Sequence, residues 1–174
     1  VDVTTVSLSS TASVVEGGSI VYTATLTNPA QGAVTVNLSN GSTITIADGA
    51  TTGTVSVATH ANNPYVDAGS VSTTITGATG GNFETLSVDS TPAVTSVTDS
   101  LDTTTLSLTG AASITEGNAG SYTVSLTSPA QTAVTVTVNY SGVAANGTDI
   151  NGTTSVIIPV NASSASFSIA ALVD

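Results

Sequence analysis

The sequence predicts an all-β protein of the β-sandwich class, and three features of the chain support this. The composition favours strands, because Thr, Ser and Val dominate while aromatic residues make up only 3% of the chain. Apolar and hydroxyl residues alternate strictly, most clearly from Ile20 to Thr27, as they do in a half-buried strand. Asn-Pro, Asn-Gly, Asp-Gly and Gly-Gly turn signals separate such segments, so we expect almost no helix.

The chain repeats itself, which predicts two tandem domains. The segment YTATLTNPAQGAVTVN at 22–37 returns as YTVSLTSPAQTAVTVT at 122–137, and Glu16-Gly17 returns as Glu116-Gly117. The boundary falls in the stretch TDSLDTTT at 98–105. We therefore predict a first unit at 1–101 and a second unit at 102–174.

The first unit contains seven alternating segments, and we expect each of them to form a strand. They cover roughly residues 4 to 9, 19 to 27, 33 to 38, 43 to 47, 52 to 58, 69 to 76 and 91 to 98. About seven strands in about 100 residues are typical of an immunoglobulin-like, Greek-key sandwich. The cysteines and tryptophan of antibody domains are missing from this chain.

The second unit repeats the first three of these segments and then diverges, which predicts about five strands. A sandwich of this kind would be truncated, lacking the strands that correspond to residues 69 to 98 of the first unit. One sheet would then have an unpaired edge, which natural proteins normally cover. We expect either that another molecule supplies the missing strands by strand exchange or that they have been lost.

The charge balance excludes several classes of partner. The chain has 11 acidic residues, no lysine or arginine, and a formal net charge of -11. Nucleic acid is therefore excluded as a partner, because no cation can neutralise its phosphates. An anionic membrane surface would repel the chain, and no segment approaches the roughly 18 apolar residues that a membrane span requires.

The acidic residues are sorted between the two ends of each predicted sandwich. Loops between consecutive antiparallel strands alternate between the ends, so each acidic residue can be assigned to one of them. One end of the first unit collects Glu16, Asp67, Asp99 and the linker residue Asp102, and one end of the second unit collects Glu116, Asp149 and Asp174. Several carboxylates without counter-ions predict a Ca²⁺ site, since Ca²⁺ takes about 6 to 8 oxygen ligands. The alternative is that they are ordinary solvated turn residues.

Other chemistry has little support in the sequence. His60 is the only histidine and lies in a predicted loop, so we expect a solvent-exposed residue, with a transition-metal ligand as the alternative. Nucleophile motifs and lysine bases are absent, so we do not expect an enzyme. A Ca²⁺-dependent carbohydrate-binding module is the alternative function, although four Tyr and two Phe leave little for an aromatic platform.

The chain resembles the repeats of large biofilm adhesins exported by type I secretion, the Lap-type and other RTX adhesins. The first unit resembles an immunoglobulin-like extender repeat through VVEGGSIVYTATLTNPA, VTVNLSNGSTITIADGATTGTVSV and YVDAGSVSTTITGATGGNFETL, and the second resembles a Calx-β repeat through SITEGNAGSYTVSL, GTDING and ALVD. The resemblance implies an extracellular spacer at the bacterial cell surface, with neighbouring repeats of the same polypeptide as partners. It also implies Ca²⁺ ligation by Glu16, Glu116, Asp149 and Asp174.

Overall fold

The computed structural model describes residues 1–173 and shows an all-β protein. These residues form sixteen strands and no helix, which confirms the predicted all-β class. The chain divides into two compact units, Val1–Leu101 and Asp102–Asp174, which are described separately below. In the described part of the chain, no helix has the length and apolar character needed to cross a membrane.

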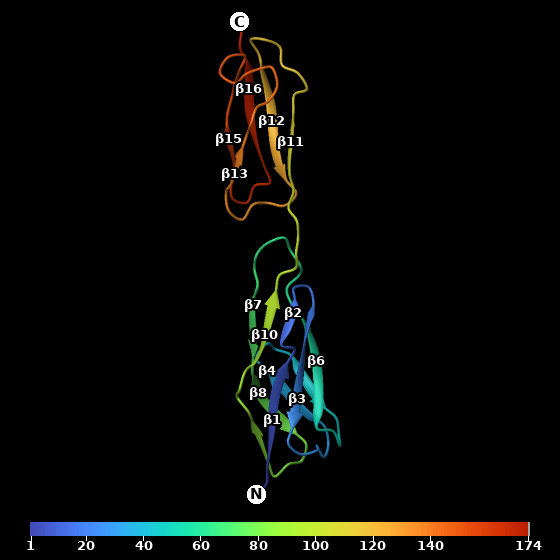
Figure 1. The fold of residues 1–174 in the computed structure, drawn as a ribbon. Coiled ribbons are helices and arrows are strands. Elements are labelled where there is room, and N and C mark those ends of the chain that lie inside the picture. The colour runs from blue at the N-terminus through green and yellow to red at the C-terminus, as the bar shows by residue number, and fades with distance from the viewer. Residues whose placement is uncertain (174) are drawn as a thin grey trace. The chain divides into compact units, whose positions relative to one another are not determined.

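The first unit contains ten strands in three sheets (Figure 1). Strands β6, β3, β1 and β9 form a four-stranded sheet in that order, while β5-β4-β8 and β2-β10-β7 form two three-stranded sheets. The bounds are β1 Val3–Ser10, β2 Ser13–Val15, β3 Ser19–Leu26, β4 Val34–Leu38, β5 Thr43–Ile46, β6 Thr52–Ala58, β7 Gly69–Thr73, β8 Ile75–Gly80, β9 Thr85–Val88 and β10 Ala93–Thr98.

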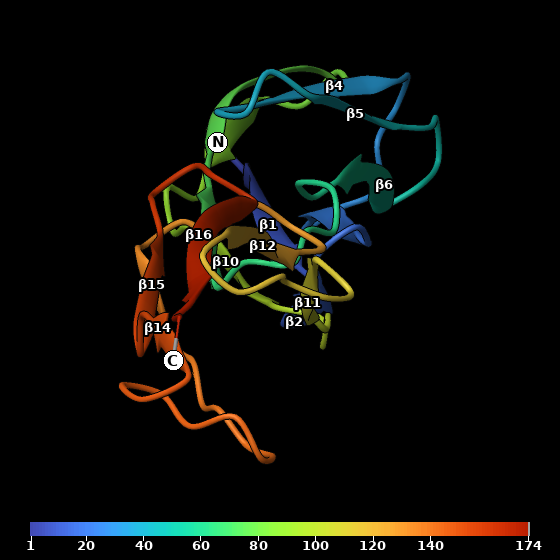
Figure 2. The same ribbon diagram turned by 90° about the horizontal axis from the view of Figure 1, so that it is seen from above.

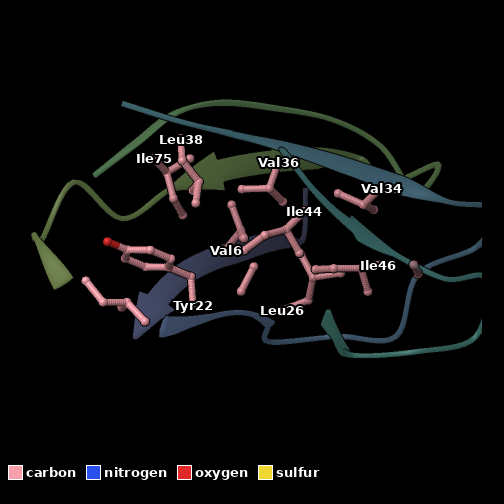
Figure 3. Packing of buried hydrophobic residues seen from close by; sticks show 12 residues of the cluster. Val6, Tyr22, Leu26, Val34, Val36, Leu38, Ile44, Ile46 and Ile75 are labelled. Atoms are coloured by element: carbon pink, nitrogen blue, oxygen red, sulfur yellow. The ribbon is translucent and has the colours of Figure 1, made fainter. Parts of the chain in front are cut away.

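The core of the first unit lies between the sheet that contains β3 and the sheet that contains β4. Alternate residues of β3 and β1 point inward from one side, as Tyr22, Leu26 and Val6 show in Figure 3. Ile44 and Val36 face them from β5 and β4, which Figure 2 shows apart from β1 and β6. The period-2 alternation read from the sequence therefore marks the buried faces of β3, β4 and β5.

The one phenol in this core has a hydrogen-bond partner. The hydroxyl of Tyr22 lies 2.9 Å from Oγ1 of Thr73, and both side chains are buried. Thr73 ends β7, in the sheet that also contains β10, so this hydrogen bond connects two sheets. A buried hydroxyl without such a partner would cost free energy, so the pair fixes how these sheets meet.

The strand pattern of the first unit corrects the sequence prediction in two ways. The segment expected as one strand at 69–76 is two strands, β7 and β8, which belong to different sheets. The chain changes sheets at Thr74, whose N–H donates to Oγ of Ser39 at 3.0 Å. Two strands were missed, β2 and β9, which have three and four residues and are too short to show a clear alternation. Both pair in parallel, β2 with β10 and β9 with β1.

The second unit contains six strands in two sheets, against the five or so expected. The sheets are β11-β12-β16-β14 and β13-β15. The bounds are β11 Leu106–Gly110, β12 Ala119–Leu126, β13 Val134–Thr137, β14 Ile150–Gly152, β15 Ser155–Ile158 and β16 Ser164–Ala171. The extra strand, β14, has only three residues and pairs with β16. A smaller core forms around Val124, Ile158 and Phe167.

Among the described residues of the second unit, two strand edges have no partner where the first unit has one. In the first unit β1 pairs with both β3 and β9, and β4 pairs with both β5 and β8. Their counterparts β11 and β13 each pair on one side only. A groove of about 230 Å³ lies between them and is lined by Leu106, Leu108, Val124 and Val136 among others.

This difference predicts unequal costs for two equivalent substitutions. Val6 pairs with Leu26 and Leu106 pairs with Leu126 at matching register, yet Val6 is 0% exposed and Leu106 is 46% exposed. We expect Val6→Ala to lower the unfolding free energy of the first unit by about 1.5–3 kcal/mol. Leu106→Ala should cost the second unit less than about 1 kcal/mol, because solvent already reaches much of its side chain. Urea unfolding of both variants checks this, and equal costs would contradict it.

Candidate metal centre

Three chain segments meet at one end of the first unit and are joined by hydrogen bonds from backbone N–H groups. The N–H of Glu16, in the loop between β2 and β3, donates to the carbonyl of Thr98 at 2.9 Å. The N–H of Gly17 donates to the carbonyl of His60 at 2.7 Å, which brings in the loop between β6 and β7. The N–H of Asp67 donates to Oδ1 of Asp99 at 3.1 Å, which joins that loop to the segment after β10. The side chains at this end are therefore held by several independent connections.

The turn that carries Glu16 depends on the glycine that follows it. Gly17 has a φ of +76°, a left-handed conformation that glycine adopts without steric cost. A Cβ at this position would also lie 3.4 Å from the backbone nitrogen of Asn62. The Glu-Gly pair thus allows a tight turn that directs the glutamate inward.

Glu16 is the buried carboxylate of this end. The residue is only 5% exposed, and its side chain is fully covered. One oxygen, Oε1, accepts hydrogen bonds from the N–H of Ser100 at 3.0 Å and from its hydroxyl at 3.2 Å. The other oxygen, Oε2, is buried and has no hydrogen-bond partner. Burial of a carboxylate oxygen in this state is costly, and a cation beside it would offset that cost.

His60 and Asp67 face this unsatisfied oxygen. The Nδ1 atom of His60 lies 3.6 Å from Oε2 of Glu16 and 3.8 Å from Oδ2 of Asp67. Asn63 donates from Nδ2 to Oδ2 of Asp67 at 2.8 Å. The pKa of the Asp67 carboxyl is lowered, chiefly by this hydrogen bond from Asn63, with further contributions from Asp99 and the nearby imidazole. Asp67 is therefore ionised across the neutral pH range.

The structure brings together three of the four residues predicted for this end. Glu16 and Asp99 are linked through Ser100, the neighbour of Asp99, and Asp67 is bonded to Asp99 directly. Asp102 follows in the chain as the first residue of the second unit, and its participation remains a prediction. The segments that carry Glu16, Asp67 and Asp99 are thus close together, whereas ligation of a metal by these residues remains a proposal.

In the second unit, two of the predicted loops lie beside the end of β16. The N–H of Gly117 donates to the carbonyl of Ala171 at 3.0 Å, and the N–H of Leu172 donates to the carbonyl of Asp149 at 2.9 Å. Oδ2 of Asp149 accepts from the N–H of Ala145 at 2.7 Å, and Glu116 is exposed. The third predicted ligand, Asp174, lies outside the described residues.

The sequence predicted His60 as an exposed loop residue, with a transition-metal ligand only as the alternative. Within residues 1–173, Glu16, His60 and Asp67 form the one set of three metal-ligating side chains whose ligand atoms all lie within 4.8 Å of one another. The exposed fraction of the His60 side chain is 44%, and the residue lies in the loop between β6 and β7, which confirms the expectation of an exposed loop residue. His60 and Asp67 lie in the same loop, between β6 and β7. The alternation of loops between the two ends of the unit therefore places His60 at the same end as Asp67.

Comparison with known families supports the repeat read from the sequence. The model of the LapA domain matches the chain twice, over residues 2–100 and over residues 102–174. A search of curated proteins finds no match to the chain.

Proposed function

Because this chain belongs to the LapA domain family, we propose that it is a calcium-stiffened spacer, or extender, region of a bacterial cell-surface adhesin. The family match covers almost the whole chain and indicates part of a LapA-type biofilm adhesin, a non-catalytic family. The proposal adds three finer statements: Ca²⁺ binds at the ends of the units, bound Ca²⁺ restricts the connecting segment, and the units act in cell adhesion and biofilm formation by holding other parts of the polypeptide apart.

The observation that carries the calcium proposal is the buried, unpartnered Oε2 of Glu16. An acidic end with no lysine or arginine in the whole chain has no protein cation of that kind to neutralise it. Glu16, Asp67 and Asp99 supply carboxylate oxygens from three loops, and Ca²⁺ accepts such irregular oxygen sets more readily than Mg²⁺ does. We propose Asp102 as the further ligand, because it follows Asp99 closely in the chain.

The second unit is proposed to bind Ca²⁺ in the same way through Glu116, Asp149 and Asp174. Its Glu-Gly turn has the same left-handed glycine, with a φ of +78° at Gly117. The loops of Glu116 and Asp149 both bond to the chain segment at the end of β16, which supports a common site.

The finer fold assignment belongs to the same proposal. The sheets of the first unit enclose one core with alternate residues from both sides, which supports an immunoglobulin-like sandwich. The second unit is proposed to be a Calx-β-like relative, and its described residues contain no counterparts of β7, β8, β9 and β10.

Calorimetric titration with Ca²⁺ after chelation tests the ligand proposal. We expect saturable binding in the first unit, weakened by Glu16→Gln and by Asp99→Asn because each removes a charged oxygen ligand. Asp48→Asn is the matched control, because Asp48 lies away from this site. Its Oδ1 accepts a hydrogen bond of 2.7 Å from the N–H of Gly32, in the loop that follows the other end of β3. Binding that is unaffected by Glu16→Gln, or weakened equally by the control, would overturn the assignment.

We further propose that the open edge of β11 accepts a strand from a second copy of this chain. Leu106 and Leu108 line the groove, and Leu108 is 58% exposed although its counterpart Leu8 packs against the core of the first unit. In the first unit β9 fills the equivalent position as a parallel partner of β1, which indicates that a strand fits there.

Sedimentation over a range of protein concentrations tests strand exchange. We expect the parent chain to dimerise as concentration rises and the Leu108→Lys variant to stay monomeric, because a charge in the groove would oppose a docked apolar strand. The matched control is Thr109→Lys, on an exposed residue of the same strand outside the groove lining, which should weaken dimerisation less. A parent chain that stays monomeric at the highest concentrations would contradict the proposal.

A further inference from the structure

We propose that Glu16, His60 and Asp67 form a binding site for a divalent transition metal of the Zn²⁺ class. The inference builds on the proposed calcium site, since Glu16 and Asp67 serve both ions, and it goes beyond that proposal by naming a second ion and a nitrogen ligand. Binding of the two ions is then competitive. All three side chains belong to the first unit, so the site needs no contribution from elsewhere.

The spacing of the three side chains is that of ligands around one ion. Nδ1 of His60 lies 3.6 Å from Oε2 of Glu16 and 3.8 Å from Oδ2 of Asp67. These separations exceed the 2.7–3.2 Å or so of an N–H···O hydrogen bond, so a shared proton does not account for them well. Two ligands that each lie about 2.0–2.1 Å from a tetrahedral ion are separated by about 3.3–3.5 Å. All three ligand atoms lie within 4.8 Å of one another, so an inward movement of the side chains would bring them to the ligand distance of one ion.

The buried oxygen of Glu16 is the second, independent observation. Its side chain is 0% exposed and Oε2 has no hydrogen-bond partner, although the atom faces the imidazole. The imidazole presents a positive charge to the two carboxylates only when it is protonated, whereas a divalent cation between the three groups balances both carboxylates and takes the place of that proton. Nδ1 also lies 3.4 Å from the carbonyl of Ala61, a long contact that metal binding would give up.

The imidazole selects the class of metal. Ca²⁺ binds through oxygen, while imidazole nitrogen suits Zn²⁺ and its neighbours among the divalent transition metals. Two carboxylate oxygens and one nitrogen leave room for a water molecule in a four-coordinate site. Replacement of the histidine should therefore remove Zn²⁺ binding and spare Ca²⁺ binding.

The second unit supplies an internal control. The strand pairs Ser19↔Ala58 in the first unit and Ala119↔Ala170 in the second have the same register. Counting two residues onward places Leu172 at the position of His60, and His60 is the only histidine in the chain. The second unit thus has the Glu-Gly turn without the imidazole, so we expect one Zn²⁺ per chain.

The single histidine makes the test direct, because its imidazole nitrogens are the only ones in a long-range ¹H–¹⁵N NMR spectrum. After metal has been removed with a chelator, we expect one equivalent of ZnCl₂ to shift the Nδ1 resonance of His60. The same amount of CaCl₂ should not cause the shift that is typical of metal ligation. In calorimetry His60→Ala should weaken Zn²⁺ binding by more than the roughly 10–100-fold caused by loss of an outer-shell partner. Its Ca²⁺ affinity should be nearly unchanged, whereas Asp99→Asn should weaken Ca²⁺ binding and retain Zn²⁺.

The outcomes separate this inference from the calcium proposal. Zn²⁺ that leaves Nδ1 unshifted, or that binds His60→Ala as tightly as the parent, would overturn the transition-metal site even if Ca²⁺ binds as proposed. Zn²⁺ ligation at Nδ1 without any Ca²⁺ binding would support the transition-metal site and overturn the calcium proposal. Circular dichroism of each variant confirms that the strands are intact before affinities are compared.

Discussion

Replacing Ile44 by alanine is expected to lower the unfolding free energy of the first unit by about 2–5 kcal/mol. Ile44 is 0% exposed and extends from β5 toward Val6 and Val36 in the centre of the core, as Figure 3 shows. Its removal leaves a cavity that the surrounding strands cannot fill, because β5 is held in register with β4 by backbone pairing. Chemical unfolding followed by circular dichroism measures the loss.

Thr45→Ala is the matched control for this substitution. Thr45 is the next residue of β5, its side chain points to the opposite face, and it is exposed. We expect a change within about 0.5 kcal/mol, and we expect the unfolding transition of the second unit to be unchanged in both variants. Comparable destabilisation by the two substitutions would show that the burial pattern of β5 is not as described.

Removal of calcium is expected to produce the second large effect. An ion that binds only the folded protein stabilises it by about 2.7 kcal/mol when its concentration is a hundredfold above the dissociation constant. We therefore expect the first unit to melt at a lower temperature after EDTA treatment. Its β-sheet circular dichroism should persist at room temperature, because the core around Tyr22 and Val36 contains none of the proposed metal-ligating side chains. Thermal unfolding with and without added Ca²⁺ measures this.

Glu16→Gln separates ion binding from other effects of EDTA. The amide keeps an oxygen but loses the charge, so the variant should gain much less stability from Ca²⁺ than the parent does. If the variant and the parent respond to Ca²⁺ equally, Glu16 is not a ligand. A parent chain whose melting temperature is indifferent to Ca²⁺ would contradict the proposed site as a whole.

Much of the fold was readable from the sequence because alternation reports directly on burial. The segments around Tyr22, Val36 and Ile44 alternate over several residues, and each is a strand with that face in the core. The short parallel strands β2 and β9 were not readable, since three or four residues contain too little pattern and parallel pairing joins segments far apart in the chain. At Thr74 the chain passes from the sheet of β7 to the sheet of β8, and the alternation of apolar and polar residues does not predict this change.

The candidate site was predictable in outline but not in chemistry. Counting loop ends placed Glu16, Asp67 and Asp99 together, and the structure links all three loops by hydrogen bonds. The same count could not show that Glu16 is buried while its counterpart Glu116 is exposed, because burial depends on how Ser100 and the loop of His60 cover it. Nor could it show which way the imidazole points.

The central proposal, that the chain is a spacer and that Ca²⁺ stiffens it, is tested most directly by small-angle scattering from the two-unit chain with Ca²⁺ and after EDTA treatment. The connecting residues 99–104 are rich in Ser and Thr and contain no proline, so without an ion we expect them to behave as a polar tether. The account predicts a narrow distribution of distances between the units with Ca²⁺, a broad one after chelation, and an intermediate one for Asp102→Asn with Ca²⁺. Scattering that does not change when metal removal has been confirmed independently would contradict it.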